Sequence, residues 1–99
     1  MAEMKVHCIH DLKTWPQFFD AIACGVKTFE LRNDDRGFQV GDVLLLREFD
    51  PYKNGGEYSG RLVRRLVIYK LEAASFQGIE KGWCIMGLEV LPEVINITA

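Results

Sequence analysis

Gly25-Val-Lys-Thr-Phe-Glu-Leu-Arg32 is the stretch in which the hydrophobic pattern of this chain changes from a helical to an alternating period. Upstream of it, Thr14-Trp-Pro-Gln17 predicts the start of a helix, because Thr14 suits the N-cap position and Gln17 completes a capping box. Gly25 predicts the end, since glycine takes the left-handed C′ conformation without steric cost. The buried face is expected to consist of the apolar residues at helical spacing, which are Trp15, Phe18, Phe19, Ile22 and Ala23.

Alternation between the two faces of a strand begins directly after Gly25, so a strand is predicted there. The apolar residues Phe29 and Leu31 share one face of that strand with Lys27. Glu30 and Arg32 are two positions apart and therefore leave the opposite face together. The end of the helix brings Lys27 close to the entrance of the face that carries Glu30 and Arg32.

Four more strands are predicted around this one. Met4–His10 precedes the helix, and Val43–Phe49 contains a continuous apolar run, typical of burial on both faces or of a closed barrel. Dense turn residues in Asp50–Gly56 indicate a hairpin into a strand from about Tyr58 to Leu71, long enough to bend. Trp83–Leu91 is the last predicted strand, after a loop with room for a helical turn, and the tail beyond it carries no clear signal.

Five strands and one helix in this order predict an α+β, mainly β fold. We expect a small pseudobarrel of five to six strands, capped by the helix near the N-terminus. A barrel also removes the exposed sheet edges that so apolar a strand as Val43–Phe49 would otherwise create. An open α+β sheet is the alternative. With 99 residues, the chain is expected to form a single domain over residues 1–99.

The balance of charged residues limits the kinds of ligand that the protein is expected to bind. The formal net charge is −2, whereas a protein that grips a long phosphate backbone usually carries a surplus of Lys and Arg. A general duplex binder is therefore disfavoured, and a pocket for one base or nucleotide remains open. No apolar run is long enough for a bilayer span and no signal-peptide pattern is present, so a cytoplasmic protein without membrane contact is expected.

Three cysteines, Cys8, Cys24 and Cys84, agree with a reducing compartment. Their number is odd and no Cys-x-x-Cys occurs, so we expect reduced, buried cysteines rather than disulfides. His7, Cys8 and His10 do not form a plausible metal site, because strand alternation separates His7 from the other two. No metal or other cofactor is expected.

The charged residues after the helix are the candidate site. Lys27 can bind a carbonyl or phosphate, or serve as a base if it is desolvated. Glu30 can accept hydrogen bonds from an exocyclic amine, and Arg32 offers a planar fork for a phosphate or a base edge. The structural alternative is that Glu30–Arg32 or Arg36–Asp34 is an ion pair at a strand end, where such pairs contribute little.

Other candidates lie outside this stretch. Arg47 follows an apolar run and needs a partner or a cavity, unless it extends to solvent from the strand end. Trp83 is either a stacking platform for a base or a core residue. His10 can transfer protons near neutral pH, with Asp11 orienting its ring, although a structural role is the alternative.

Four charged stretches follow one another along the chain: Gly25-Val-Lys-Thr-Phe-Glu-Leu-Arg32, Asn33-Asp-Asp-Arg36, Phe38-Gln-Val-Gly-Asp42 and Leu46-Arg-Glu-Phe-Asp-Pro51. Together they resemble the ASCH superfamily of the PUA-like fold, and more closely its small single-domain members from bacteria and phages, a family of unknown function. The resemblance implies a pseudobarrel with a cleft for RNA, a nucleotide or a modified base. One branch of the superfamily hydrolyses acetylated cytidine with a Lys, a Thr and a Glu. Lys27 matches the lysine, but Glu30 stands where the threonine is expected.

Three hypotheses follow. The first is a binding domain for RNA or a nucleotide, whose site consists of Lys27, Glu30, Arg32, Arg36, Arg47, His10 and Trp83. In the second, Lys27 and Glu30 are catalytic residues of a hydrolase acting on modified nucleosides. In the third, the domain binds a protein and modulates it. The oligomeric state is left open by the sequence.

Overall fold

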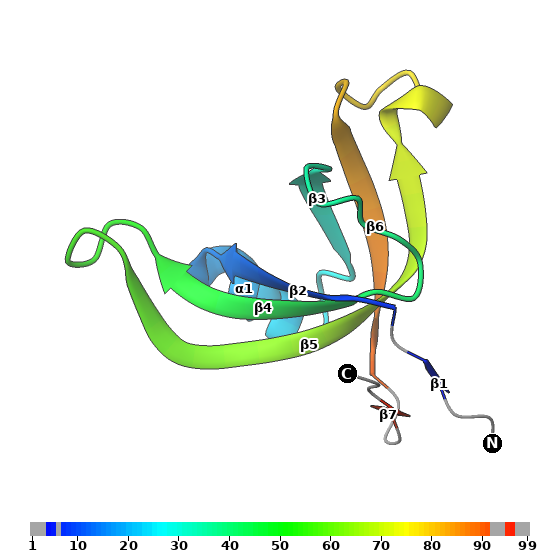
Figure 1. Cartoon of the computed structure of the whole chain (residues 1–99). Coiled ribbons are helices and arrows are strands. Elements are labelled where there is room, and N and C mark those ends of the chain that lie inside the picture. The colour runs from blue at the N-terminus through cyan, green and yellow to red at the C-terminus, as the bar shows by residue number, and fades with distance from the viewer. Residues whose placement is uncertain (1–3, 6, 92–94, 97–99) are drawn as a thin grey trace.

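A computed structural model of the protein describes residues 4–5, 7–91 and 95–96. Its main feature is a five-stranded sheet in the order β2-β4-β5-β6-β3 (Figure 1). The strands of this sheet are β2 (Ile9–Thr14), β3 (Phe29–Asn33), β4 (Val43–Asp50), β5 (Glu57–Glu72) and β6 (Trp83–Val90). The remaining elements are α1 (Pro16–Ala23), the 3-10 helix η1 (Ala73–Ser75), and a short parallel pair of β1 (Met4–Lys5) with β7 (Ile95–Asn96).

The sheet curls because β5 is long and bends. Its 16 residues pair with β4 over the first part and with β6 over the second, with register irregularities at Arg47/Phe49 and at Val67/Tyr69. Figure 1 shows the two parts of the sheet at a steep angle to each other, with α1 beside β2 and β4. β2 runs parallel to β4, and the other pairs are antiparallel. The predicted mainly β, α+β pseudobarrel with one N-terminal helix is thereby confirmed in the form of a curled half-barrel.

Since the sheet does not close through backbone pairing, β2 and β3 remain as its two edges. The core lies inside the curl and includes Ile22 of α1 and Phe38 of the loop after β3. The predicted burial of the third strand on both faces is only partly met: the inner face of β4 is buried, whereas the outer face is buried at Val43 and half-buried at Leu45 and Arg47. Leu44 and Leu46 belong to the main core, and Val43 packs in a second cluster with Leu66.

The N-terminal prediction was wrong in its bounds. The expected strand Met4–His10 is two separate strands, and β2 continues to Thr14 because each polar residue at its odd positions faces solvent while His10, Leu12 and Thr14 are buried. Thr14 therefore ends a strand instead of capping the helix. The N-cap is Trp15, without a side-chain hydrogen bond, and Pro16 opens the first turn.

The C-terminal end of the helix lies where it was predicted, but the buried face of the helix is narrower than predicted. Gly25 has φ +85°, which a left-handed C′ residue requires. Phe19 and Ile22 are buried, whereas Trp15 and Phe18 are 42% and 46% exposed. A helix of eight residues lies against β4 along one narrow stripe, so the other two aromatic rings remain at the surface.

The expectation of three buried cysteines is correct only for Cys84. Cys24 is exposed because it follows the last turn of α1, and Cys8 is exposed because it precedes the first residue of β2. Burial raises the pKa of the Cys84 thiol, so it behaves as an apolar core residue. None of the helices among the described residues has the length and apolar character needed to cross a bilayer. Most of the tail from Pro92, for which no element was predicted, lies outside the described residues, although β7 falls within it.

Candidate functional site

A cleft of about 690 Å³ opens between the two edge strands, β2 and β3. Its apolar walls come from both edges, from α1 and from the loops, and include Leu12, Trp15, Phe18, Phe29, Leu31, Phe38 and Trp83. Its charged side chains are Lys27, Glu30, Arg32, Asp35 and Arg36, whereas Lys13 borders the cleft but points its side chain outward, toward Phe49. Three cations and two carboxylates give this cleft a formal surplus of one positive charge, in a chain whose net charge is −2. The cleft therefore favours an anionic ligand with a flat apolar part.

Glu30 is the buried centre of the site, at 3% exposure. Lys27 Nζ donates to Glu30 Oε1 at 2.8 Å, and Arg32 Nε donates to Glu30 Oε2 at 2.7 Å. Lys27 Nζ also donates to the carbonyl of Phe29 at 2.7 Å. The two predicted relations, Glu30 with Arg32 on one face and Lys27 beside them, are both present. The ion pair that was the structural alternative also exists, but it lines the cleft instead of decorating the outside.

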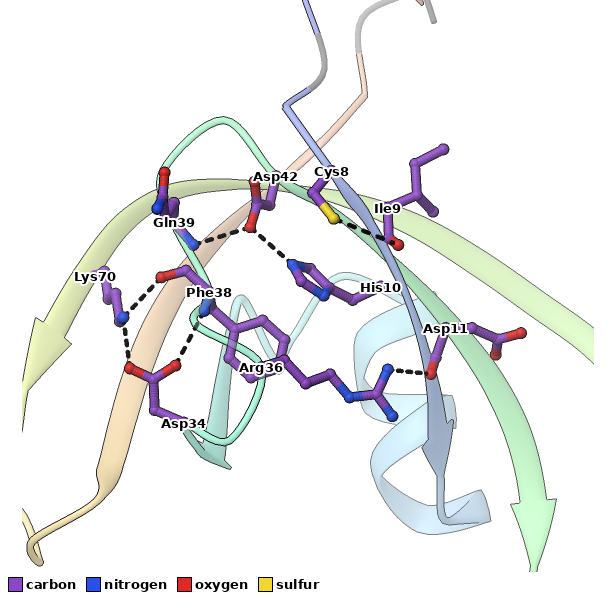
Figure 2. A network of polar contacts seen from close by, with 10 residues as sticks. All are labelled: Cys8, Ile9, His10, Asp11, Asp34, Arg36, Phe38, Gln39, Asp42 and Lys70. Carbon is purple, nitrogen blue, oxygen red and sulfur yellow. Dashed lines mark hydrogen bonds and ion pairs between the residues drawn. The ribbon is translucent and has the colours of Figure 1, made fainter. Parts of the chain in front are cut away.

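Arg32 of β3 and Arg36 of the loop after β3 both reach the edge strand β2. Arg32 Nη2 donates to the carbonyl of Lys13 at 2.9 Å and lies 3.5 Å from Thr14 Oγ1. Arg36 Nη1 donates to the carbonyl of Asp11 at 2.9 Å, as Figure 2 shows. Carbonyls at a free sheet edge need partners, and here guanidinium groups supply them in place of another strand. These contacts hold the two sides of the cleft at a fixed separation without closing it.

The loop that carries Arg36 is fastened to the sheet by Lys70 of β5 (Figure 2). Lys70 Nζ donates to Asp34 Oδ2 at 2.6 Å and to the carbonyl of Phe38 at 2.7 Å. Asp34 Oδ1 in turn accepts from the backbone N–H of Phe38 at 3.0 Å. Burial acts to raise the pKa of Asp34, but the hydrogen bonds from Lys70 and the backbone outweigh it, so the pKa lies below the ordinary value. The alternative pair Arg36–Asp34 does not form, because Lys70 takes the carboxylate.

His10 is buried beneath the cleft rather than open to it. Its Nε2 lies 2.8 Å from Asp42 Oδ2, and its ring meets the Phe38 ring edge-on at 4.7 Å. Asp42 also accepts from the backbone N–H of Gln39. Figure 2 shows the histidine ring pointing toward Asp42. Asp11, the residue expected to orient His10, faces the other side of β2, so that expectation was wrong. His10 supports Phe38, which forms part of the cleft wall.

The two remaining predicted site residues, Trp83 and Arg47, lie on different sides of the sheet's cleft boundary: one lines the cleft and the other does not. Trp83 is half-buried and lines the cleft. Arg47 does not line it, because alternation turns its side chain to the outer face of the sheet. There Arg47 Nη1 lies 3.3 Å from Asp11 Oδ2, and Arg47 Cζ lies 4.0 Å from the centre of the Tyr58 ring. Of the seven proposed site residues, five therefore lie at the cleft, while His10 and Arg47 lie outside it.

Apart from Trp83, the aromatic walls of the cleft were not predicted from the sequence. Trp15, Phe18 and Phe29 are each close to half exposed and border the cleft. The ammonium of Lys27 lies 4.8 Å from the centre of the Phe29 ring and 5.9 Å from that of Phe18. A short helix with three large apolar residues and a tryptophan at its N-cap cannot bury all four on one face, and that excess was the available signal for Trp15 and Phe18. Aromatic faces beside cations suit a planar, anionic ligand.

No three of the His, Cys, Asp and Glu residues among those described gather into a group that could hold a metal ion. What the described side chains provide is an array of hydrogen-bond donors, one buried carboxylate and exposed aromatic faces. This arrangement can bind a phosphate or carbonyl at the cations and pack a ring against the walls.

Comparison with known proteins places residues 9–88 in the family described as "Domain of unknown function (DUF3850)". The matched segment contains every residue that lines the cleft. A protein of Escherichia phage P2, named "Uncharacterized 12.9 kDa protein in GpA 3'region", is 36% identical over 55 residues. That alignment covers 56% of this chain but only 47% of the phage protein, so the chain matches about half the length of this relative.

Proposed function

This chain belongs to the DUF3850 family, and we propose that its cleft binds a nucleotide, or one base of a single-stranded RNA. The resemblance of its charged stretches to the ASCH superfamily supports the proposal, because that resemblance implies a cleft for RNA or a nucleoside. A binder of this kind acts where RNA and nucleotides occur, so we further propose a cytoplasmic location.

One observation carries the proposal: a buried carboxylate, Glu30, lies between two cations at the floor of a positively charged cleft with aromatic walls. Glu30 keeps Lys27 and Arg32 in place before any ligand arrives, which lowers the entropic cost of binding. The same carboxylate has lone pairs left for an exocyclic amine, since each oxygen accepts only one hydrogen bond from these two cations.

The proposal assigns a role to each side chain at the cleft. Lys27 and Arg32 contact phosphate or carbonyl oxygens, and Arg36 contributes positive charge at the rim. Trp83 and Phe29 offer ring faces on which a base stacks. A carboxylate that reads an amine also distinguishes amino-bearing bases from those without one.

Equilibrium binding of a panel of nucleosides, nucleotides and short single-stranded RNAs tests the proposal. We expect wild type to bind at least one of them and Lys27→Met to bind it at least about tenfold more weakly, since a charge-assisted hydrogen bond is lost. Lys81→Met is the matched control, because Lys81 is exposed in a turn and does not line the cleft. Failure of every panel member to bind would refute nucleotide binding, and equal affinities of Lys27→Met and wild type would refute binding at this cleft.

A hydrolase for modified nucleosides is the second candidate, favoured by the contact between Lys27 and the buried Glu30. Two such groups within hydrogen-bond reach can act as an acid–base pair. However, the lysine ammonium already donates to Glu30 and to Phe29, an arrangement that suits binding better than proton abstraction. Turnover of acylated nucleosides by wild type, and none by Lys27→Met, would establish the enzyme. Absence of turnover with retained binding would leave the binding domain.

A further inference from the structure

The aromatic wall of the cleft continues beyond it, onto the hairpin between β4 and β5. Trp15 lies against Phe18, with nearly parallel rings whose centres are 6.4 Å apart. The Trp15 ring also contacts the Tyr52 ring, with the ring centres 6.1 Å apart and an angle of 65° between the planes. Phe18, Trp15 and Tyr52 thus form a continuous row, which we call the aromatic track. Its first two members line the cleft and its third does not.

Tyr52 is 85% exposed, yet its position is defined. Its backbone N–H donates to Asp50 Oδ1 at 2.9 Å, and the turn is closed by a hydrogen bond from Gly56 N–H to the carbonyl of Lys53 at 2.8 Å. The Tyr52 ring contacts Trp15 at a steep angle and is otherwise largely open to solvent. A large ring held at the surface next to a cleft is an arrangement that recognition sites use for stacking.

A cation lies between the cleft and the hairpin. Lys13 borders the cleft at the free edge of β2, and its side chain points outward and places the ammonium 4.5 Å from the centre of the Phe49 ring, close to the end of β4. An ammonium over an aromatic ring is held weakly at an exposed site, so it is free to turn toward an anion. A phosphate that joins one base in the cleft to another outside it would meet this group.

We propose that the ligand is a single strand of nucleic acid rather than a free nucleotide. One base enters the cleft, the linking phosphate contacts Lys13, and the next base stacks on Tyr52. This inference rests on the proposed function and extends it, because it adds a second base subsite on a residue outside the cleft.

The track also has an end. On the hairpin beyond Tyr52, a hollow of about 420 Å³ carries three carboxylates, Glu48, Asp50 and Glu57, with one lysine, Lys53. Arg61 pairs with Glu48, and Lys53 pairs with Glu57, so this lining offers no free cation to a further phosphate. The bound segment is therefore short, and additional nucleotides beyond the second or third contribute little.

Calorimetric titration of the intact protein with uridine and adenosine 5′-monophosphates and with their RNA oligomers of two, three and six nucleotides tests this inference. The same lengths of thymidine and deoxyadenosine DNA distinguish RNA from DNA as the source of the strand. We expect affinity to rise about tenfold from one to two or three nucleotides, as a stacked base implies, and then to level off. Tyr52→Ala should remove this gain and leave monophosphate affinity unchanged, whereas Tyr52→Phe should retain it.

Tyr69→Ala is the matched control, because Tyr69 is also exposed but lies on β5 outside the aromatic track. An unaltered gain with length in Tyr52→Ala, or no gain in wild type that binds monophosphates, would overturn the inference and leave the proposed function intact. Weakened monophosphate binding by Tyr52→Ala would also overturn it, since Tyr52 would then belong to the first base site. No binding at any length would reject both proposals.

Discussion

At the scale of single residues, Glu30 is the group on which the cleft depends. Its carboxylate is 3% exposed and both of its oxygens accept hydrogen bonds from cations. A buried carboxylate is costly unless it is paired, and its removal leaves the two cations without their acceptor. Glu30 therefore has a structural and a binding role at once, which explains why an ion pair and a ligand site coincide here.

Glu30→Gln tests the structural part of this role. The amide keeps the shape but loses the charge and one acceptor, so the free energy of unfolding should fall by about 1–3 kcal/mol. Urea denaturation measures this change. Glu89→Gln, at an exposed position on β6, should remain within about 0.5 kcal/mol of wild type. Equal stability of Glu30→Gln and wild type would mean that the carboxylate does not organise the cations.

At the scale of elements, the loop between β3 and β4 is a fixed wall of the cleft. Lys70 holds Asp34 and the carbonyl of Phe38, and Arg36 of the same loop reaches β2. Burial opposes the charge of Lys70, but its hydrogen bonds to Asp34 and Glu72 outweigh this effect and raise its pKa. The raised pKa of the lysine and the lowered pKa of Asp34 agree in indicating a favourable contact.

This contact predicts how stability depends on pH. The pKa of Asp34 is lower in the folded than in the unfolded chain, so its contribution is present above the ordinary value of 3.8 and is lost as pH falls through the lowered value. Lys70→Met should therefore reduce the loss of stability on acidification from about pH 5 to pH 2. Lys81→Met is the control. Identical acid profiles of Lys70→Met and wild type would exclude this loop contact as a source of acid sensitivity.

Elements with a clear period could be predicted, whereas contacts between distant residues could not. Alternation from Phe29 and the apolar run from Val43 led to β3 and β4 nearly at their observed bounds. β2 was misplaced because Thr14-Trp-Pro-Gln17 suggested a helix start, whereas Thr14 ends a strand whose outward positions carry Asp11 and Lys13. The pairing of Asp34 with Lys70, 36 positions apart, follows only from the register of the curled sheet.

At the scale of the whole molecule, the half-barrel gathers positive charge at one cleft of a chain whose net charge is negative. One edge of β2 and one edge of β3 remain free, and the side chains of three of the 12 Lys and Arg residues line the opening between them. A net negative chain repels a long polyanion, while the local surplus attracts a short one. The fold therefore favours a ligand that makes few phosphate contacts over one that makes many.

The salt dependence of the binding affinity measures the number of phosphate contacts. For a single strand, the logarithm of the association constant should fall with the logarithm of salt concentration at a slope of about −0.7 per phosphate contacted. With one to three contacts, we expect a slope between about −0.7 and −2 between 50 and 200 mM salt. A slope steeper than about −4 would indicate an extended interface and would contradict recognition within the cleft.

Both tryptophans of the chain, Trp15 and Trp83, line the cleft, and this allows the most direct test of the central claim. Their indole N–H resonances can be followed by NMR while a nucleotide or short single-stranded RNA is added. We predict that both indole signals shift and saturate together with the backbone amides of Glu30 and Arg32. Binding that shifts instead Arg47 and Tyr58 on the outer face, with both indole signals unmoved, would contradict the account.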